Sequence, residues 1–228
     1  MTPDTTARPK LEVFAMERLQ STWENRVEWN VSESGVHPLR VEELVADADS
    51  FAALMSQALG YPQTNGTVEL RSAIAAMYPG ATPDHVEVTN GGSEANLIAL
   101  MHLVEPGDEV VMMTPNYMQV AGLSRWLGAT VKVWPLVLAS GPGPGAHRWQ
   151  ADIEALSALV GNRTKAILIC NPNNPTGARL TSAELDDISR IAARAGAWIL
   201  SDEIYRGAEL DGIETATVWG RAERVLVT

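Results

Sequence analysis

The feature that most constrains the fold is an alternation of apolar runs and helical patterns that extends from residue 86 to residue 228. Apolar runs bounded by turn residues predict strands at 86–89, 109–115, 130–136, 165–171, 197–202 and 224–228. Apolar side chains at helical spacing predict helices at 93–104, 118–128, 150–161 and 181–196. Strands that alternate with helices predict an α/β fold in three layers, with a mostly parallel sheet covered by helices on both faces.

The residues before this alternation predict an N-terminal extension. Residues 1–9 are polar and contain two prolines, which predicts a loose arm, and apolar spacing predicts a helix within 10–25. A further helix is predicted at 67–78. We therefore expect an N-terminal arm and helix over residues 1–34 and one large domain over residues 35–228.

Charge and composition exclude several classes of function. The net charge of −11 argues against nucleic acid and against an anionic membrane, because both attract basic surfaces. The single cysteine, Cys170, offers no disulfide framework and is expected to be a small core side chain. The sequence shows no secretory signal and no run of 18 apolar residues. Its four histidines lack metal-ligand spacing. We expect a cytoplasmic protein that handles small molecules and has no metal, nucleic-acid or membrane partner.

The loops that follow the predicted strands carry the residues of chemical interest, because ligands of parallel sheets bind beyond the carboxyl ends of the strands. The stretch "NGGSE" at 90–94 places free backbone N–H groups at a helix N-terminus, which suits a phosphate, although a simple glycine turn is an alternative. Neither G-x-G-x-x-G nor a P-loop is present, so a nucleotide-binding α/β domain is disfavoured.

Three more strand-end loops have both a functional and a purely structural interpretation. Tyr117 offers a flat face near the anion site, or is an ordinary half-buried aromatic residue. The stretch "NPNNPTG" at 171–177 holds a side-chain amide at a fixed place, or is only a rigid turn. Asp202 ends an apolar strand with a carboxylate, which is either functional or a satisfied core or capping group.

Taken in order, "TNGGSEAN", "PNY", "NPNNPTG" and "SDEIYRG" resemble the class I/II aminotransferases, a family of fold type I enzymes that use pyridoxal 5′-phosphate. The resemblance extends from about Ser32 to Thr228. It implies a large cofactor-binding domain of that fold. It also implies transfer of an amino group between an amino acid and a 2-oxo acid.

The resemblance assigns cofactor contacts to particular positions. The cofactor phosphate is expected at the following residues: Gly91, Gly92, Ser93 and Glu94. Tyr117 is expected to stack on the cofactor ring, and Asn174 and Tyr205 to donate to its phenolic oxygen. Asp202 is expected to pair with the ring nitrogen, so that Asp202 and Tyr205 are the catalytic residues.

Two further positions concern the substrate and the oligomer. Gly35 resembles the glycine near the substrate carboxylate. Tyr61 resembles the tyrosine that reaches the cofactor phosphate of a neighbouring subunit, which implies a homodimer with shared active sites.

The resemblance also implies groups that this sequence does not supply. In the family, a lysine that forms a Schiff base with the cofactor follows the strand resembled by 224–228, and Lys10, Lys132 and Lys165 do not match its position. The family's small C-terminal domain, its substrate-binding arginine and its last strand of the large domain are likewise unmatched. We therefore expect an incomplete fold that is inactive and aggregation-prone on its own. Other pyridoxal-phosphate reactions (decarboxylase, racemase, β-lyase, cyclase) and a non-catalytic binding module remain alternatives.

Overall fold

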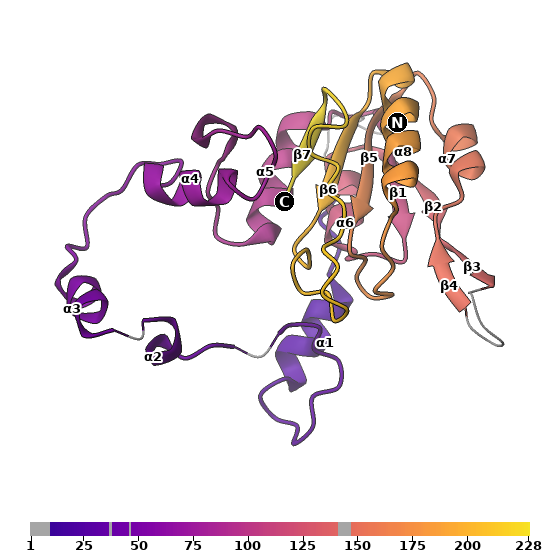
Figure 1. Cartoon of the computed structure of the whole chain (residues 1–228). Coiled ribbons are helices and arrows are strands. Elements are labelled where there is room, and N and C mark those ends of the chain that lie inside the picture. Colours follow the sequence, from indigo (N-terminus) through magenta and orange to yellow (C-terminus); the bar gives the residue numbers. More distant parts are fainter. Residues whose placement is uncertain (1–9, 37, 46, 141–146) are drawn as a thin grey trace, which may run out of the picture.

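The computed structural model describes residues 10–36, 38–45, 47–140 and 147–228. Its body is a five-stranded parallel sheet in the order β2-β1-β5-β6-β7 (Figure 1). The strands are β1 (Glu109–Thr114), β2 (Thr130–Pro135), β5 (Thr164–Cys170), β6 (Trp198–Asp202) and β7 (Val225–Val227). The predicted parallel sheet is confirmed.

Helices cover both faces of this sheet. They are α5 (Gly92–Leu103), α6 (Gln119–Trp126), α7 (Ile153–Leu159) and α8 (Ser182–Ala195). Alternate residues of β1 point to opposite faces: Val110 and Met112 pack with α5 and α6, whereas Val111 and Met113 pack with α7 and α8. The chain therefore has the two apolar interfaces of a three-layer α/β fold, as the sequence predicts.

The chain connections create a crevice between β1 and β5. Helix α6 leads from β1 outward to β2 on one face, while α8 leads from β5 outward to β6 on the other. Where connections diverge in this way, the loops at the carboxyl ends of the two strands separate and leave room for a ligand. The loops 115–117 and 171–177 are those loops.

Two local predictions are wrong. Residues 86–89 do not form a strand: they follow the short 3-10 helix η1 (Pro83–His85), and the Val88 N–H bonds to the Asn65 carbonyl in a loop rather than to a strand. An apolar run becomes a strand only where a neighbouring strand completes its hydrogen bonds.

The sequence patterns predict no strand between the strand at 130–136 and the helix at 150–161, but β3 (Val137–Ser140) and β4 (His147–Gln150) pair there antiparallel. Both strands are largely exposed, so they lack the alternation of buried and exposed residues that marks a strand in a sequence.

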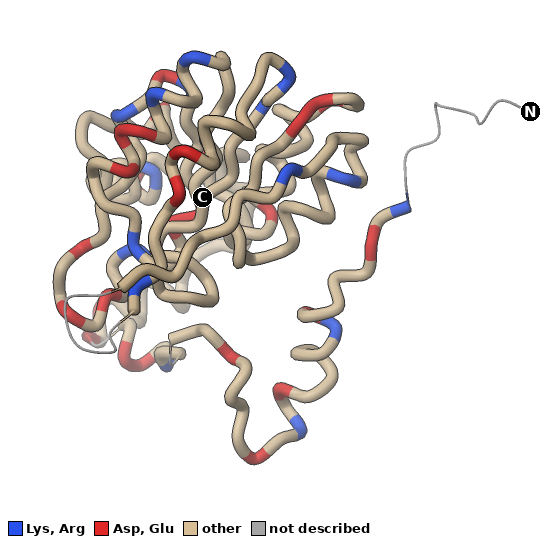
Figure 2. The backbone as a smooth tube through the Cα atoms, turned by 90° about the vertical axis from the view of Figure 1, so that its right-hand side faces the viewer, with Lys and Arg blue, Asp and Glu red and all other residues tan. Residues whose placement is uncertain are grey.

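The N-terminal third lies around the body rather than within it. Its helices are α1 (Ala15–Trp23), α2 (Val41–Leu44), α3 (Ala48–Ser56) and α4 (Val68–Ala75). Figure 1 shows α1 below the carboxyl ends of the strands, and α2 and α3 on an excursion away from the sheet. Figure 2 shows the segment that contains α1 descending beside the body, with acidic and basic residues along it. The prediction for residues 1–9 lies outside the described residues.

None of the helices in the described part of the chain combines the length and the apolar character needed to cross a bilayer.

Candidate active site

A cavity of about 410 Å³ lies at the carboxyl ends of the strands, where the sequence places the candidate residues. It is bounded by the strand-end loops, by the start of α5 and by the N-terminal segment. Six of the residues predicted from the sequence line it: Gly92, Ser93, Tyr117, Asn174, Asp202 and Tyr205. The fold thus brings together groups that are up to 113 residues apart, from Gly92 to Tyr205.

The start of α5 offers an anion-binding cradle. Gly91 precedes the helix with φ of 85°, a conformation that favours glycine. No acceptor among the described residues takes the backbone N–H of Gly92 or of Ser93, and a Cβ added at Gly92 would meet open space. Glu94 shapes this turn, because its carboxylate accepts hydrogen bonds from the backbone N–H and side-chain amide of Asn90. Free N–H groups at the positive end of a helix suit a phosphate.

Tyr117 is held from the side of the N-terminal segment. Its hydroxyl donates to the Glu17 carboxylate at 2.8 Å, and the Phe14 ring meets the Tyr117 ring edge-on at 5.1 Å between centroids. Burial raises the pKa of the Tyr117 phenol, so the hydroxyl stays protonated and can donate. Helix α1 therefore covers one side of the cavity.

The three asparagines of "NPNNPTG" divide into two roles. Asn171 is fully buried: its amide donates to the Ala216 carbonyl and its oxygen accepts from the Leu180 N–H, both at 2.8 Å. Asn173 is also buried, and its amide donates to the Pro115 carbonyl at 3.0 Å. For the Asn174 side chain, the described residues supply no hydrogen-bond partner, and it lines the cavity. Two asparagines thus fix the loop, and the third is left for a ligand.

Cys170 supports the position of Asn174. Its thiol accepts from the Asn174 backbone N–H and donates to the Pro172 carbonyl, both at 3.3 Å. Burial raises the pKa of the Cys170 thiol to about 12, so the sulfur is protonated at neutral pH. Cys170 is buried, as predicted, and it also shapes the loop.

Asp202 is the acid of the site. It ends β6 beside Cys170 in the sheet register, and one carboxylate oxygen accepts from the Ile204 N–H at 3.2 Å. Burial raises the pKa of Asp202, while the hydrogen bonds from Ile204 and from the Asn96 side chain oppose that shift. No Lys or Arg belongs to the described lining of the cavity. A carboxylate in this position has a strong preference for a cationic partner.

Tyr205 meets Ser34, the neighbour of Gly35, in the lining of the cavity. The Tyr205 hydroxyl lies 2.7 Å from the Ser34 hydroxyl. Gly35, the next residue, is exposed, and its N–H donates to the Glu33 carboxylate at 2.8 Å. Tyr61 is not in the cavity: it lies fully exposed on the segment between α3 and α4.

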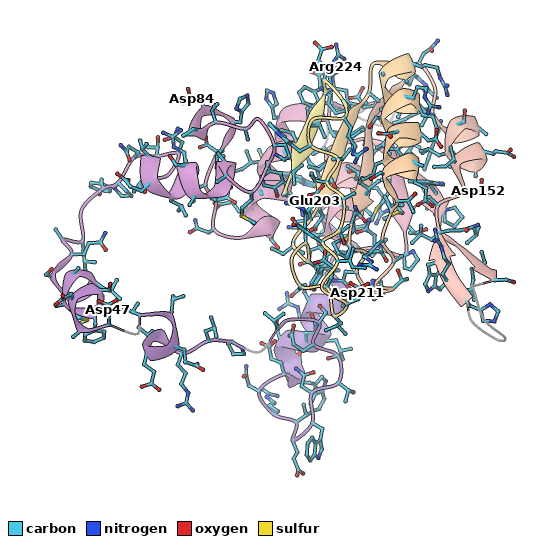
Figure 3. All side chains as sticks on the ribbon, in the orientation of Figure 1. Asp47, Asp84, Asp152, Glu203, Asp211 and Arg224 are labelled. Atoms are coloured by element: carbon cyan, nitrogen blue, oxygen red, sulfur yellow. The ribbon has the colours of Figure 1, made fainter. Side chains whose placement is uncertain are left out.

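A second cavity of about 470 Å³ adjoins the first and shares the side chains of Asn174 and Tyr205 with it. Arg179 lines it and forms a bidentate ion pair with Asp211, at 2.6 and 3.0 Å. Figure 3 shows Asp211 at the lower end of the body and Arg224 at the opposite end of the sheet. The second cavity therefore extends the site outward at the same sheet edge.

Lys132 and Lys165 are not placed to serve the acid. Lys132 lies on edge strand β2, where its ammonium pairs with Glu109 at 2.6 Å and donates to the Leu159 carbonyl. Lys165 is near the start of β5, so it lies at the end of the sheet opposite Asp202.

Three residues that line or shape the cavity carry no clear signal in the sequence. Glu17 and Ser34 come from the N-terminal segment, whose docking depends on tertiary contacts. Asn96 lies on α5 and is buried. In the sequence, Asn96 lies beside the apolar face of the predicted helix at 93–104, which is consistent with burial but indicates no role.

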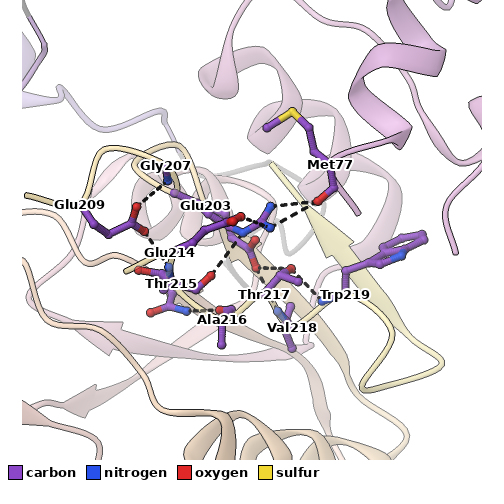
Figure 4. Close-up of polar contacts among 12 residues, drawn as sticks. Met77, Glu203, Gly207, Glu209, Glu214, Thr215, Ala216, Thr217, Val218 and Trp219 are labelled. Atoms are coloured by element: carbon purple, nitrogen blue, oxygen red, sulfur yellow. Dashed lines mark hydrogen bonds and ion pairs between the residues drawn. The ribbon is translucent and has the colours of Figure 1, made fainter. Parts of the chain in front are cut away.

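The neighbour of Asp202 along the chain is a second buried acid with a separate network. Glu203 is 4% exposed, and one carboxylate oxygen accepts from the Thr217 hydroxyl and the Val218 N–H at 3.0 and 3.1 Å (Figure 4). The same oxygen accepts from the Ser201 hydroxyl at 3.2 Å. No hydrogen-bond partner among the described residues meets its other oxygen. Burial raises the pKa of Glu203, and the three hydrogen bonds oppose this only in part.

This pKa predicts a pH-dependent stability. In the unfolded chain Glu203 titrates near 4.5, and in the folded chain above that value. As pH rises from 4 towards 7, the unfolded chain loses its proton first, so the free energy of unfolding falls. Glu203→Gln removes this titration, and we expect its stability relative to the original chain to be greater at pH 7 than at pH 4. Urea unfolding at both pH values measures the difference.

Glu209 is the matched control, because its pKa is shifted in the opposite direction to that of Glu203. Burial would raise its pKa, but hydrogen bonds from the N–H groups of Thr215 and Gly207 outweigh this and lower it to about 2. Glu209→Gln should therefore lose stability relative to the original chain at pH 7 and less so at pH 3. A difference for Glu203→Gln that is equal at pH 4 and pH 7 would mean that folding does not raise the pKa of Glu203.

The fold is that of a large domain of the pyridoxal-phosphate transferase type, and one cavity joins a helix N-terminus, an acid and two polar side chains. The sequence model of the family "Aminotransferase class I and II" matches residues 30–227. The chain belongs to this family.

Individual relatives agree with this assignment. The chain is 35% identical over 192 residues to the probable N-succinyldiaminopimelate aminotransferase DapC of Mycobacterium tuberculosis, covering 80% of this chain and 46% of the relative. It is 32% identical to the aspartate aminotransferase of Thermotoga maritima, covering 72% of this chain and 42% of the relative.

Solved structures show the same similarity. A pyridoxal-phosphate-dependent aminotransferase from Streptococcus suis superposes with a TM-score of 0.85 at 30% identity, over 96% of this chain and 57% of that one. The N-succinyldiaminopimelate aminotransferase of Mycobacterium tuberculosis superposes with a TM-score of 0.67 at 35% identity, over 78% of this chain and 47% of that one. The chain spans about half the length of the relatives that it matches.

Proposed function

We propose that this chain forms the pyridoxal 5′-phosphate-binding domain of an aminotransferase that moves an amino group between an amino acid and a 2-oxo acid. The observation that supports it most strongly is the single cavity that combines the α5 cradle, the free Asn174 amide and the partly buried Asp202 carboxylate. Relatives named as aminotransferases support the reaction class.

The residues present fit this cofactor. The N–H groups of Gly92 and Ser93, which lie between Gly91 and Glu94, would hold its phosphate. The N-terminal end of helix α5 favours the negative charge of that phosphate. Tyr117 would lie against its ring, and Asn174 and Tyr205 would donate to its phenolic oxygen. The polar groups that line this pocket therefore suit the phosphate, the phenolic oxygen and the ring nitrogen of the cofactor.

The cofactor supplies an electron sink for the electron pair released at the α-carbon of the amino acid. Asp202 would keep a proton on the ring nitrogen, because its carboxylate is largely shielded from solvent and no Lys or Arg belongs to the described lining of the cavity. Tyr205 and Asn174 stabilise negative charge on the phenolic oxygen by hydrogen bonding. Gly35 would leave room for the substrate carboxylate at the mouth of the cavity, beside Ser34.

A homodimer with shared active sites is part of the proposal. The excursion that carries α2 and α3 exposes large apolar side chains, and neither helix contributes a buried residue. Exposed apolar surface of this kind marks an association surface. Tyr61 at the end of this excursion is free to reach a neighbouring subunit. We place the enzyme in the cytoplasm and divide the chain into residues 1–34 and a large domain from residue 35.

Equilibrium dialysis of the purified chain tests the cofactor assignment. We expect it to bind pyridoxal 5′-phosphate and to bind pyridoxal, which lacks the phosphate, at least about tenfold more weakly, since each charge-assisted hydrogen bond is worth more than 1 kcal/mol. Ser93→Asp places a negative charge in the cradle and should abolish the preference for the phosphate. The same change on the distant α3, Ser56→Asp, is the matched control and should leave it intact.

The reaction class has its own test on the longest natural polypeptide that carries this sequence. Amino acids supplied with a 2-oxo acid should give a new amino acid and a new 2-oxo acid in equal amounts. Release of CO₂ or racemisation without amino transfer would replace the aminotransferase proposal by another reaction of the same cofactor. A chain that does not bind the cofactor would leave the proposal without its basis.

A further inference from the structure

Asn96 is a buried polar residue that lies beside Asp202 in the lining of the cavity. It is 2% exposed on α5, one turn after the cradle, and the residues that follow it on the same side, Ala99 and Leu100, belong to an apolar core. Burying an amide is unfavourable unless its donors and acceptors are paired. Asn96 nevertheless lines the cavity together with Asp202.

Three elements converge on this amide. The Thr228 hydroxyl donates to the Asn96 oxygen at 3.0 Å. The Asn96 side chain lies in the same cavity lining as Asp202 at the end of β6, and hydrogen bonding from it lowers the pKa of that carboxyl. Thr228 is itself held, because its N–H donates to Ser201 and its carbonyl accepts from the Glu203 N–H, at 2.9 and 2.8 Å. The hydroxyl that holds Asn96 therefore has a fixed position.

These contacts decide which way the amide points. With its oxygen turned to the Thr228 hydroxyl, Asn96 presents its NH₂ group to the Asp202 carboxylate. The reverse orientation would set two acceptor oxygens against each other in a buried place. Asn96 is thus a neutral donor to the acid, and unlike an arginine or lysine it leaves the negative charge of Asp202 uncompensated.

We propose that Asn96 is a positioning residue, which orients the Asp202 carboxylate towards the ring nitrogen of the cofactor and keeps its charge available, while Thr228 fixes the orientation of the Asn96 amide. This inference rests on the proposed function for its ligand. It adds a residue that acts through Asp202: Asn96 ends the stretch "TNGGSEAN", but the resemblance assigns it no role.

The first test needs no cofactor. In the chain carrying ¹³C-labelled aspartate, the carboxyl signal of Asp202 is followed between pH 3 and pH 8. Asn96→Leu keeps a similar volume in an apolar environment but removes the donor, and we expect it to raise the pKa of Asp202. Thr228→Val should also raise the pKa of Asp202, but by less than Asn96→Leu. Thr228→Ser keeps the hydroxyl and should leave the pKa of Asp202 unchanged.

Other titratable groups that face Asp202 are the same in all four proteins. They are Cys170 on β5, Tyr117 after β1, Tyr205 after β6, and three glutamates of the N-terminal segment: Glu17, Glu24 and Glu33. Burial raises the pKa values of Cys170 and Tyr117, so both stay protonated over this range. Comparison between variants then cancels the contribution of the glutamates.

The second test uses ¹⁵N-labelled pyridoxal 5′-phosphate bound to the chain. Without Asn96 the carboxylate is more basic and draws the shared proton towards itself. The ratio of protonated to neutral ring nitrogen should fall by about tenfold in Asn96→Leu, as expected for one lost hydrogen bond to a charged acceptor. A merely structural role for Asn96 would leave this ratio unchanged in the protein that still binds the cofactor.

The outcomes separate this inference from the proposed function. If the original chain does not bind the cofactor, the function fails, and the aspartate titration still decides the role of Asn96. If the chain binds the cofactor and Asp202 titrates identically in the original and Asn96→Leu proteins, the inference is overturned. If Asn96→Leu does not fold, Thr228→Val decides instead: an unchanged pKa of Asp202 overturns the inference, and a raised one supports it.

Discussion

Asp202→Asn is expected to lower kcat by about a thousandfold while changing the affinity for pyridoxal 5′-phosphate by less than about tenfold. A carboxylate about 4 Å from a cation, at an effective dielectric constant of about 20, offers about 4 kcal/mol, or about three pKa units, in favour of the protonated ring. Asparagine keeps the shape of the side chain but not its charge. Cofactor affinity depends mostly on the α5 cradle and the side-chain donors, which the substitution leaves in place.

The measurement is steady-state kinetics on the longest natural polypeptide that carries this sequence, with cofactor affinity determined in parallel. Asp84→Asn is the control, since Asp84 is an exposed acid on η1, remote from the cavity, and only weakly paired with Arg71 at 3.7 Å. Equal kcat in Asp202→Asn and the original protein would exclude the role given to the acid. A parallel loss of cofactor affinity would instead make Asp202 a binding residue.

The sequence predicts the sheet and the position of the acid because both follow from local patterns. Apolar runs of β1, β5 and β6 alternate with capped helices, and the parallel arrangement then places the ends of these strands at one edge. Asp202 and Asn174 are found in the sequence for the same reason: Asp202 ends such a run, and Asn174 lies in the loop that follows one.

The other features of the fold and of the site depend on contacts between distant segments, which a local sequence pattern cannot show. Residues 86–89 have the composition of a strand, but the described residues offer them no strand partner. The docking of α1 rests on a few contacts, such as that between Glu17 and Tyr117, which are 100 residues apart. The role of Asn96 requires that α5, β6 and β7 meet, which only the tertiary fold determines.

The second large expected effect separates the structural from the ligand-binding asparagines of "NPNNPTG". Asn171→Ala should lower the free energy of unfolding by about 3 kcal/mol, because it leaves two backbone groups without partners and each such loss costs about 1–3 kcal/mol. Those groups are the N–H of buried Leu180 and the carbonyl of Ala216. Urea unfolding of the chain, followed by tryptophan fluorescence, measures the change.

Asn174→Ala is the matched control, three residues away in the same loop. Its side chain makes no hydrogen bond within the described residues, so the loss of stability should stay within about 0.5 kcal/mol, as for a substitution that removes no buried contact. The same variant should bind pyridoxal 5′-phosphate more weakly, since the amide is a proposed donor to it. Equal destabilisation by both substitutions would show that Asn174 also holds the loop, and the assignment of its amide to a ligand would then be wrong. If only Asn171→Ala loses stability and Asn174→Ala loses cofactor affinity, then Asn171 holds the loop in place and the Asn174 amide is free to bind the ligand.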